Sequence, residues 1–246
     1  MLRITQVADG VHFAETKGVN WTLLTEGDSV TLVDAGYPAD APLVAASLDR
    51  IGRRPEQLLA VLVTHAHVDH IGGLPALLAS APGARVLTSE REARHARREF
   101  LEQATPRDVA ANLWRPGVLP WALHIIRAGA LKKVSVPAAE AITGTGPLDL
   151  PGRPVPVVTP GHTSGHTCYH LPDTGVLITG DALVTGHWTS RIDGPQRITP
   201  FFDHDREAAG TALGLLRPLP ADILLPGHGP VHRGPVAEAV DTALGR

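Results

Sequence analysis

Short apolar runs that each stop at a small or polar residue constrain the fold of this chain more than any other feature. They cover residues 30–33, 58–63, 155–158, 176–179 and 223–225. Because the runs are short, β-branched and ended by small or polar residues, they predict buried strands. Helical patterns lie between them, at about residues 42–51, 73–80, 90–103 and 206–216. Strands alternating with helices predict an α/β architecture of layered sheets.

The first 25 or so residues have a different pattern. Residues 11–14 and 21–24 are apolar and flank polar turns, which is typical of antiparallel strands. A mixed sheet is therefore expected rather than a purely parallel one. A chain of 246 residues can form one large core, so we predict a single domain over residues 1–246.

Residues 106–137 do not fit the strand and helix patterns. Trp114, Trp121 and the pair Ile125-Ile126 lie there among prolines and glycines, and Lys132-Lys133 follows. A long irregular segment inside a compact domain is more often functional than idle. The insert either caps a pocket or packs on the surface of the helices, and the sequence leaves both interpretations open.

Composition excludes several classes of function. With 22 Lys and Arg against 25 Asp and Glu, the net charge is −3, so nucleic acid is not an expected partner. No stretch approaches the roughly 20 apolar residues of a membrane span, and the start lacks a signal-peptide pattern. We therefore expect a cytoplasmic protein with no membrane partner.

The single cysteine, Cys168, excludes an intrachain disulfide and a thiolate-rich metal site. It is expected to be a small buried hydrophobe. Any metal must then be held by nitrogen and oxygen atoms, and the chain has 13 histidines to supply nitrogen.

The densest group of such ligands follows the apolar run 58–63, where His65, His67, Asp69 and His70 lie within six residues. So many desolvated polar groups would be costly to cluster without a cation between them. In an extended segment His65 and His67 point to the same side and can share a metal. The turn at Asp69-His70 can present its two groups to a neighbouring position.

Three more candidate ligands, His162, Asp181 and His228, each follow a glycine at the end of another predicted strand. Sites in layered α/β sheets are assembled at such strand ends, and glycine lets the backbone bend close to a shared centre. These residues are enough for two metal ions. One would take His65, His67 and His162, and the other Asp69, His70 and His228, with Asp181 as the bridge. Each ion keeps room for a solvent molecule, which is typical of a catalytic site.

Taken together, these motifs resemble the metallo-β-lactamase fold superfamily. The matching segments, within about residues 10–235, are 65–70 (HAHVDH), 160–167 (PGHTSGHT), 179–182 (TGDA) and 226–229 (PGHG). The resemblance implies a four-layer αβ/βα sandwich with two mixed β-sheets and a dinuclear metal site at their shared edge. It also implies that Asp34 supports the first histidine motif from behind, although a strand-end Asp can instead cap a turn. His166 is expected to be structural rather than a ligand.

The superfamily includes β-lactamases, thioesterases such as glyoxalase II, lactonases, phosphodiesterases, sulfatases and oxygen-handling iron proteins, so the fold does not decide the substrate. Asp181 argues against a β-lactamase, and only 18 residues follow His228 where glyoxalase II carries a helical domain. A basic cluster near the motifs would favour a phosphodiesterase, and the sequence has none there. Persulfide dioxygenases with a single iron use two His and one Asp, so the full set of seven ligands argues against them.

We therefore predict a metal-dependent hydrolase that binds two Zn²⁺, with Fe or Mn as alternative metals. A hydroxide bridging the two metals would attack a small ester, lactone or thioester, and Asp69 would orient it and carry a proton to the leaving group. A β-lactamase, a phosphodiesterase, an iron-dependent persulfide dioxygenase-like enzyme and a non-catalytic member of the fold are the alternatives. The oligomeric state stays open.

Substrate contacts are less constrained. Five of the few aromatic residues lie in the insert or after Asp181, namely Trp114, Trp121, Trp188, Phe201 and Phe202. They either line an apolar acyl pocket or fill the core. His187 and His204 either bind substrate or lie on the surface.

Overall fold

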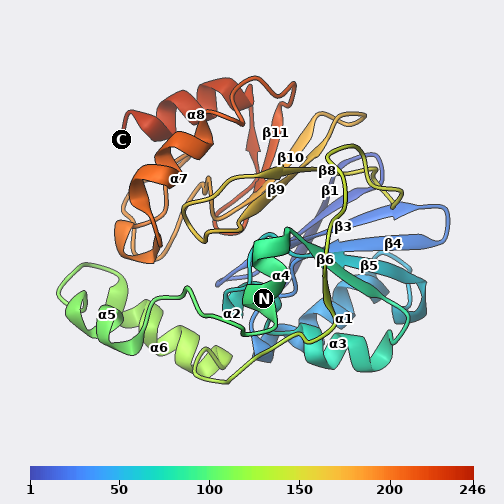
Figure 1. Cartoon of the computed structure of the whole chain (residues 1–246), viewed down its shortest axis with the longest axis horizontal. Coiled ribbons are helices and arrows are strands. Elements are labelled where there is room, and N and C mark those ends of the chain that lie inside the picture. Colours follow the sequence, from blue (N-terminus) through green and yellow to red (C-terminus); the bar gives the residue numbers. More distant parts are fainter.

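The computed structural model describes all 246 residues and shows two β-sheets packed face to face (Figure 1). The helices α1 (Ala41–Arg50) and α3 (Leu74–Ser80) cover the first sheet, while α7 (Arg206–Leu213) and α8 (Val236–Leu244) cover the second. This arrangement confirms the αβ/βα sandwich. None of the helices combines the length and the apolar character that crossing a membrane requires.

The first sheet has seven strands that lie side by side in the order of the sequence. Pairing is antiparallel from β1 to β4 and parallel from β4 to β7, so the sheet is mixed and its first strands are antiparallel, as predicted. The strands are β1 (Arg3–Ala8), β2 (Val11–Glu15), β3 (Asn20–Glu26), β4 (Ser29–Val33), β5 (Leu58–Leu62), β6 (Arg85–Thr88) and β7 (Ala139–Ala141).

The second sheet has five strands in the order β12-β11-β10-β9-β8. Only β10 and β11 pair in parallel, so this sheet is mixed as well. Its strands are β8 (Val155–Val158), β9 (Thr167–Leu171), β10 (Val176–Gly180), β11 (Ile223–Pro226) and β12 (His232–Arg233). Phe13, Leu62 and Tyr169 are among the fully buried side chains that pack between the two sheets.

Two of the predicted helices are shorter than expected. The helix predicted over residues 90–103 is α4 (Glu90–Ala96), and α7 ends at Leu213 rather than at residue 216. Arg98 follows α4 with a φ of 63°, a left-handed conformation that ends a helix. Its guanidinium donates to the backbone oxygens of Ala66 (2.9 Å) and Val134 (2.6 Å). Arg98 therefore connects the segment that carries His65 and His67 to the insert.

The expectation of an irregular insert is wrong, because residues 106–137 contain α5 (Pro106–Ala111) and α6 (Val118–Ala128). Pro106 and Pro120 lie in the first turns of these helices, where proline is tolerated. Gly117 and Gly129 flank α6 in left-handed conformations, with φ of 83° and 94°. The prolines and glycines that made the segment look irregular therefore lie at the ends of its helices. In Figure 1 both helices lie to one side of the sandwich, in green.

Four short helical segments complete the chain. They are α2 (Val68–Ile71) and the 3₁₀ turns η1 (Pro38–Asp40), η2 (Pro55–Gln57) and η3 (Pro200–Phe202). Of these, α2 carries two of the predicted ligands and η3 carries two of the aromatic side chains.

Candidate metal centre

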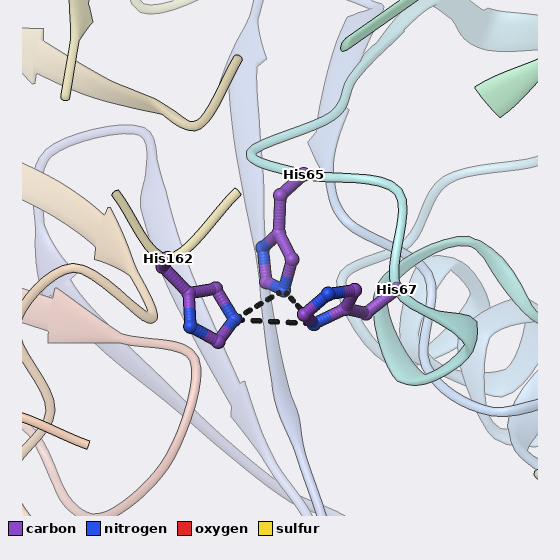
Figure 2. Close-up of side chains that lie close together, drawn as sticks. All are labelled: His65, His67 and His162. Atoms are coloured by element: carbon purple, nitrogen blue, oxygen red, sulfur yellow. Dashed lines mark hydrogen bonds between the residues drawn. The ribbon is translucent and has the colours of Figure 1, made fainter. Parts of the chain in front are cut away.

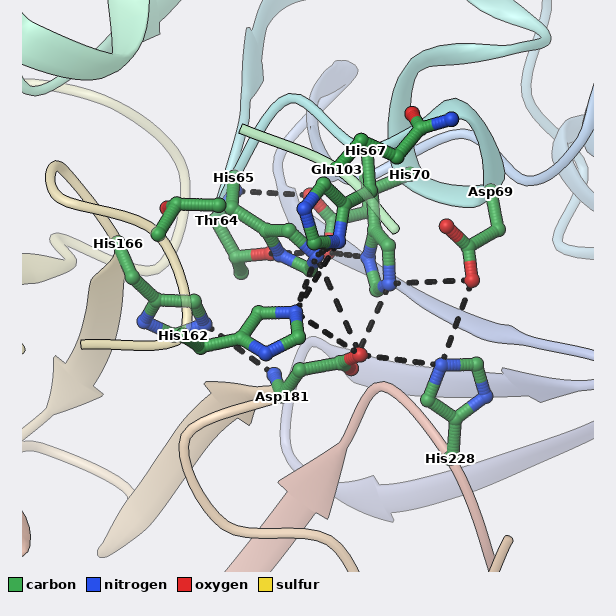
Figure 3. A network of polar contacts seen from close by, with 12 residues as sticks. Thr64, His65, His67, Asp69, His70, Gln103, His162, His166, Asp181 and His228 are labelled. Carbon is green, nitrogen blue, oxygen red and sulfur yellow. Dashed lines mark hydrogen bonds and ion pairs between the residues drawn. The ribbon is translucent and has the colours of Figure 1, made fainter. Parts of the chain in front are cut away.

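The seven predicted ligand side chains come from four segments that follow β5, β8, β10 and β11 (Figure 3). The segment after β5 carries His65, His67, Asp69 and His70, and the other three carry one ligand each. All seven meet at the same edge of the sandwich and fall into three overlapping groups, in which the ligand atoms lie within 4.8 Å of one another. Six of the side chains are buried and Asp69 is partly buried.

Three imidazoles form the first group (Figure 2). Nε2 of His65 lies 3.1 Å from Nδ1 of His67, and Nε2 of His162 lies 3.2 and 3.1 Å from these two nitrogens. Ligand nitrogens about 2.0–2.1 Å from a tetrahedral zinc ion are separated by roughly 3.3–3.4 Å. The triangle of nitrogens therefore has nearly the size that such an ion needs.

The second group contains Asp69, His70 and His228. Oδ2 of Asp69 lies 3.4 Å from Nε2 of His228 and 3.8 Å from Nε2 of His70. Asp181 lies between the two groups, with its oxygens 3.5 Å from His162, 3.4 Å from His70 and 3.2 Å from His228. Its carboxylate is thus within reach of cations held by either group.

Unpartnered polar atoms test whether these residues fit a metal. Nε2 of His70 and Oδ1 of Asp181 are buried and lie 3.4 Å apart, but neither has a hydrogen-bond partner. Leaving such atoms unsatisfied costs about 1–3 kcal/mol each. Nitrogen and carboxylate oxygen are ligands for divalent ions such as zinc. The donor set and its two orphaned atoms therefore fit divalent metal binding.

The electrostatics differ between the two groups. Burial, together with the neighbouring imidazoles, lowers the pKa of His65 well below its usual value, and burial and His162 do the same for His67. Both rings are therefore neutral, the form that binds metal. Burial also disfavours charge on His228, but Asp181 and Asp69 outweigh it and raise the pKa of His228 to about 10. Without a metal, His228 therefore keeps its proton, because the carboxylates of Asp181 and Asp69 attract positive charge to this place.

Asp34 lies behind the histidine motif, as the resemblance implied. Its carboxylate accepts hydrogen bonds from the backbone N–H (2.8 Å) and hydroxyl (2.7 Å) of Thr64 and from Nδ1 of His70 (2.8 Å). The last contact leaves Nε2 of His70 free to face the centre. His166 also has a structural place, because its Nδ1 lies 2.8 Å from the Thr159 hydroxyl and its Nε2 accepts from the backbone N–H of Asp181.

Three further carboxylate residues support the ligand loops and were not predicted. Glu92 accepts from the backbone N–H of Ala66 at 2.6 Å, the backbone oxygen of Glu102 lies 2.6 Å from Nε2 of His67, and Asp203 lies 3.3 Å from Nδ1 of His162. Glu92 occupies the inner face of α4, beside buried alanines. An acidic residue within an apolar helical face is the one signal in the sequence that could have identified it.

Glycine at the predicted positions is required by close packing. A Cβ on Gly227 would lie 2.3 Å from Oδ1 of Asp181, and Gly180 has a φ of 48°. The loops that carry Asp181 and His228 can approach the centre only because these two positions lack a side chain.

A cavity of about 800 Å³ opens over the centre. Five of the predicted ligands face it, and its other walls include Tyr37, Trp121, Ile125, Ile198 and Phe202. Of the aromatic residues singled out, only Trp121 and Phe202 line this cavity. Trp188 lines a separate pocket of about 310 Å³, Phe201 packs beside Phe202, and Trp114 is 79% exposed.

The two remaining histidines differ. His187 lines the cavity, and burial lowers its pKa to about 3, so its ring is neutral. His204 is half exposed and lies 3.8 Å from Glu102. Cys168 is fully buried, as predicted, and burial raises the pKa of its thiol to about 12.

Comparison with known proteins assigns the family. Residues 15–228 match the family model of the metallo-beta-lactamase superfamily. The chain belongs to this superfamily. Among its relatives, the probable metallo-hydrolase YflN of Bacillus subtilis (strain 168) is 26% identical, covering 92% of this chain and 89% of that protein. A hydroxyacylglutathione hydrolase of Rhizobium meliloti (strain 1021) is 30% identical, but over only 58% of this chain and 41% of that protein.

Solved structures agree on the fold. A metallo-β-lactamase of Cronobacter sakazakii superimposes with a TM-score of 0.69 at 21% identity, covering 97% of this chain and 90% of that one. Identity at this level shows the fold alone. The family and the His/Asp cluster together describe a metallo-hydrolase of the metallo-β-lactamase fold with a site suited to divalent metal.

Proposed function

We propose that the protein is a dinuclear zinc-dependent hydrolase of small esters, lactones or thioesters. One observation carries the proposal most directly. The Asp181 carboxylate lies between a group of three imidazoles and a mixed His/Asp group, and both groups border one cavity. A shared carboxylate between two ligand groups is the arrangement that holds two cations close together.

When bound, a pair of divalent ions supplies Lewis acidity and a water of lowered pKa. His65, His67 and His162 would hold one ion, and Asp69, His70 and His228 the other, with Asp181 between them. Asp69 is the one of these side chains that is not fully buried, and it lines the cavity. His70 and His228 outweigh the effect of burial and lower the pKa of Asp69, so its carboxylate is ionised. It can accept a hydrogen bond from a nucleophilic water and pass the proton to a leaving group.

The walls of the cavity support an acyl substrate. Trp121, Ile125, Ile198 and Phe202 make much of the lining apolar, which suits a hydrocarbon chain. Among the cations of the lining, the guanidinium of Arg98 donates to backbone oxygens, whereas Lys132 and Lys133 form no ion pair, so the phosphodiester in the assay below tests whether these lysines hold a phosphate. The partial similarity to a hydroxyacylglutathione hydrolase adds weight to a thioester.

The test is steady-state hydrolysis by zinc-loaded protein of an acyl thioester, an acyl lactone, a cephalosporin and a phosphodiester. Turnover confined to the first two is the expected result. Preferential cephalosporin turnover would establish the β-lactamase alternative. Failure to hydrolyse any member of the panel would refute the proposed activity.

Asp69→Ala serves as the blank in the same assay. We expect it to lose at least about 10³-fold in kcat/KM, because the residue is proposed both to hold a metal and to move a proton. His232→Ala is the matched control, since His232 lies in β12 and belongs to none of the ligand groups. Equal losses in the two variants would contradict the assignment of Asp69.

A further inference from the structure

Helix α6 is apolar on two faces, and only one of them is covered. Val118, Trp121 and Ala122 are buried against the rest of the protein. On the outer face, Leu119 and Leu123 are 53% and 47% exposed, and Ile126 is 51% exposed. A helix that is apolar all round is normally buried on all sides.

Further exposed apolar residues flank α6 in the sequence. The apolar patch consists of Leu113, Trp114, Leu119, Leu123, Ile126 and Leu131. These are six of the 13 large hydrophobic residues that the whole chain exposes, and they lie within residues 113–131. Exposed apolar groups gathered in this way mark an interaction surface rather than ordinary scatter.

The segment that carries the patch is positively charged. Residues 106–133 contain Arg107, Arg115, Arg127, Lys132 and Lys133 against a single acid, Asp108, a net charge of +4. The whole chain carries −3, so the remaining residues carry −7. None of the five cations forms an ion pair within the protein; by contrast, Arg85, Arg94 and Arg217 do. Arg115 lies over the ring of Trp114, 5.8 Å from its centroid.

The patch also borders the cavity of the metal centre. Leu131 belongs to the patch and also lines the cavity. The adjacent Lys132 and Lys133 line the cavity as well. On the inner face of α6, Trp121 and Ile125 form part of the same wall. Figure 1 shows α5 and α6 at one side of the sandwich, and the inner face of α6 packs against Trp188, Phe201 and Phe202.

We propose that residues 106–133 dock on the surface of a bilayer that contains anionic lipid. An exposed Trp and several Leu and Ile side chains, accompanied by unpaired Arg and Lys, form the combination that binds the interface of a charged membrane. A second copy of the chain fits less well. A symmetric dimer through this patch would bring the two segments of charge +4 against each other.

This docking departs from the expectation of no membrane partner. That expectation rested on the lack of a spanning segment, and a helix that lies in the interface needs none. The inference is also independent of the proposed activity, because it rests on the outer face of α6 and not on the ligands. Docked in this way, the lipid surface would lie beside the cavity opening, within reach of an acyl chain.

The experiment is co-sedimentation of the full-length protein with vesicles of phosphatidylcholine alone and of phosphatidylcholine mixed with phosphatidylglycerol. We expect at least about tenfold tighter binding to the mixed vesicles, and loss of this preference at about 1 M salt. The variant Leu119→Ser/Leu123→Ser/Ile126→Ser should weaken binding by more than about tenfold, because it removes the apolar anchor. Arg115→Glu/Arg127→Glu should abolish the preference for the anionic vesicles.

Leu59→Ser/Leu215→Ser/Leu244→Ser is the matched control, since these residues are 45%, 53% and 45% exposed at other places on the surface. It should bind vesicles as the unchanged protein does. Equal binding to both kinds of vesicle, or an equal loss in the control, would overturn the proposal. Sedimentation velocity tests the alternative of a dimer. The proposal would also be overturned if the protein failed to bind vesicles and formed a dimer that the Leu119→Ser/Leu123→Ser/Ile126→Ser variant dissociates.

Discussion

The metal centre and the insert are organised in opposite ways. At the centre, nearly every polar side chain is buried and held by a second residue, as His70 is held by Asp34 and His67 by the backbone of Glu102. The insert instead leaves much of its apolar surface exposed and five cations unpaired. The polar side chains of the candidate metal centre are thus held in fixed positions by the fold. The exposed apolar and cationic side chains of the insert are instead available to contact the proposed lipid surface.

The largest expected effect concerns the carboxylate that joins the two ligand groups. Asp181→Ala should lower kcat/KM by at least about 10³-fold, because its oxygens lie 3.2–3.5 Å from three of the histidines. Kinetics on the preferred acyl substrate and metal content per chain would measure it. Asp173→Ala, on an exposed turn, is the control. A loss smaller than tenfold would show that the two groups do not depend on a shared ligand.

A smaller effect is expected behind the ligands. Asp34→Asn removes the charge that His70 and Thr64 face, but asparagine tolerates the left-handed backbone at this position, where φ is 62°. We expect metal affinity to fall about 10- to 100-fold. Competition with a chromophoric chelator would measure it, and Asp49→Asn, on the exposed side of α1, should leave the affinity unchanged. Unchanged affinity in Asp34→Asn would mean that Asp34 only shapes the turn.

The same contrast decides how much the sequence could predict. The gathering of the candidate ligands at one edge was predictable, because a strand ends where its apolar run ends and loops from neighbouring strands share one edge. The supports were harder to predict, because Glu92 and Asp203 reach the centre only through tertiary packing. In the insert, Gly117 and Gly129 have the φ values that start and end α6, yet a sequence does not show whether a glycine interrupts a helix or caps it.

A third prediction concerns the part of the insert that does face the cavity. Trp121 is buried and its ring centroid lies 5.1 Å from that of Phe202. Trp121→Leu keeps an apolar wall but loses this aromatic contact, worth about 0.5–1.5 kcal/mol. We expect KM to rise about threefold to tenfold, because the cavity wall loses part of its shape, while kcat stays within about twofold, because Trp121 belongs to none of the ligand groups. A fall in kcat with unchanged KM would place Trp121 in the chemistry instead.

The smallest effect on the isolated protein is expected at the other tryptophan of the insert. Trp114 is 79% exposed, so Trp114→Ala should change the free energy of unfolding by less than about 0.5 kcal/mol and leave KM unchanged. Denaturant titration and kinetics without lipid would measure both. With vesicles present the variant should differ, because the indole is the largest apolar group of the patch, and its affinity for anionic vesicles should fall. A clear loss of stability without lipid would mean that Trp114 packs within the protein and that the insert resembles the metal centre more closely than its exposure indicates.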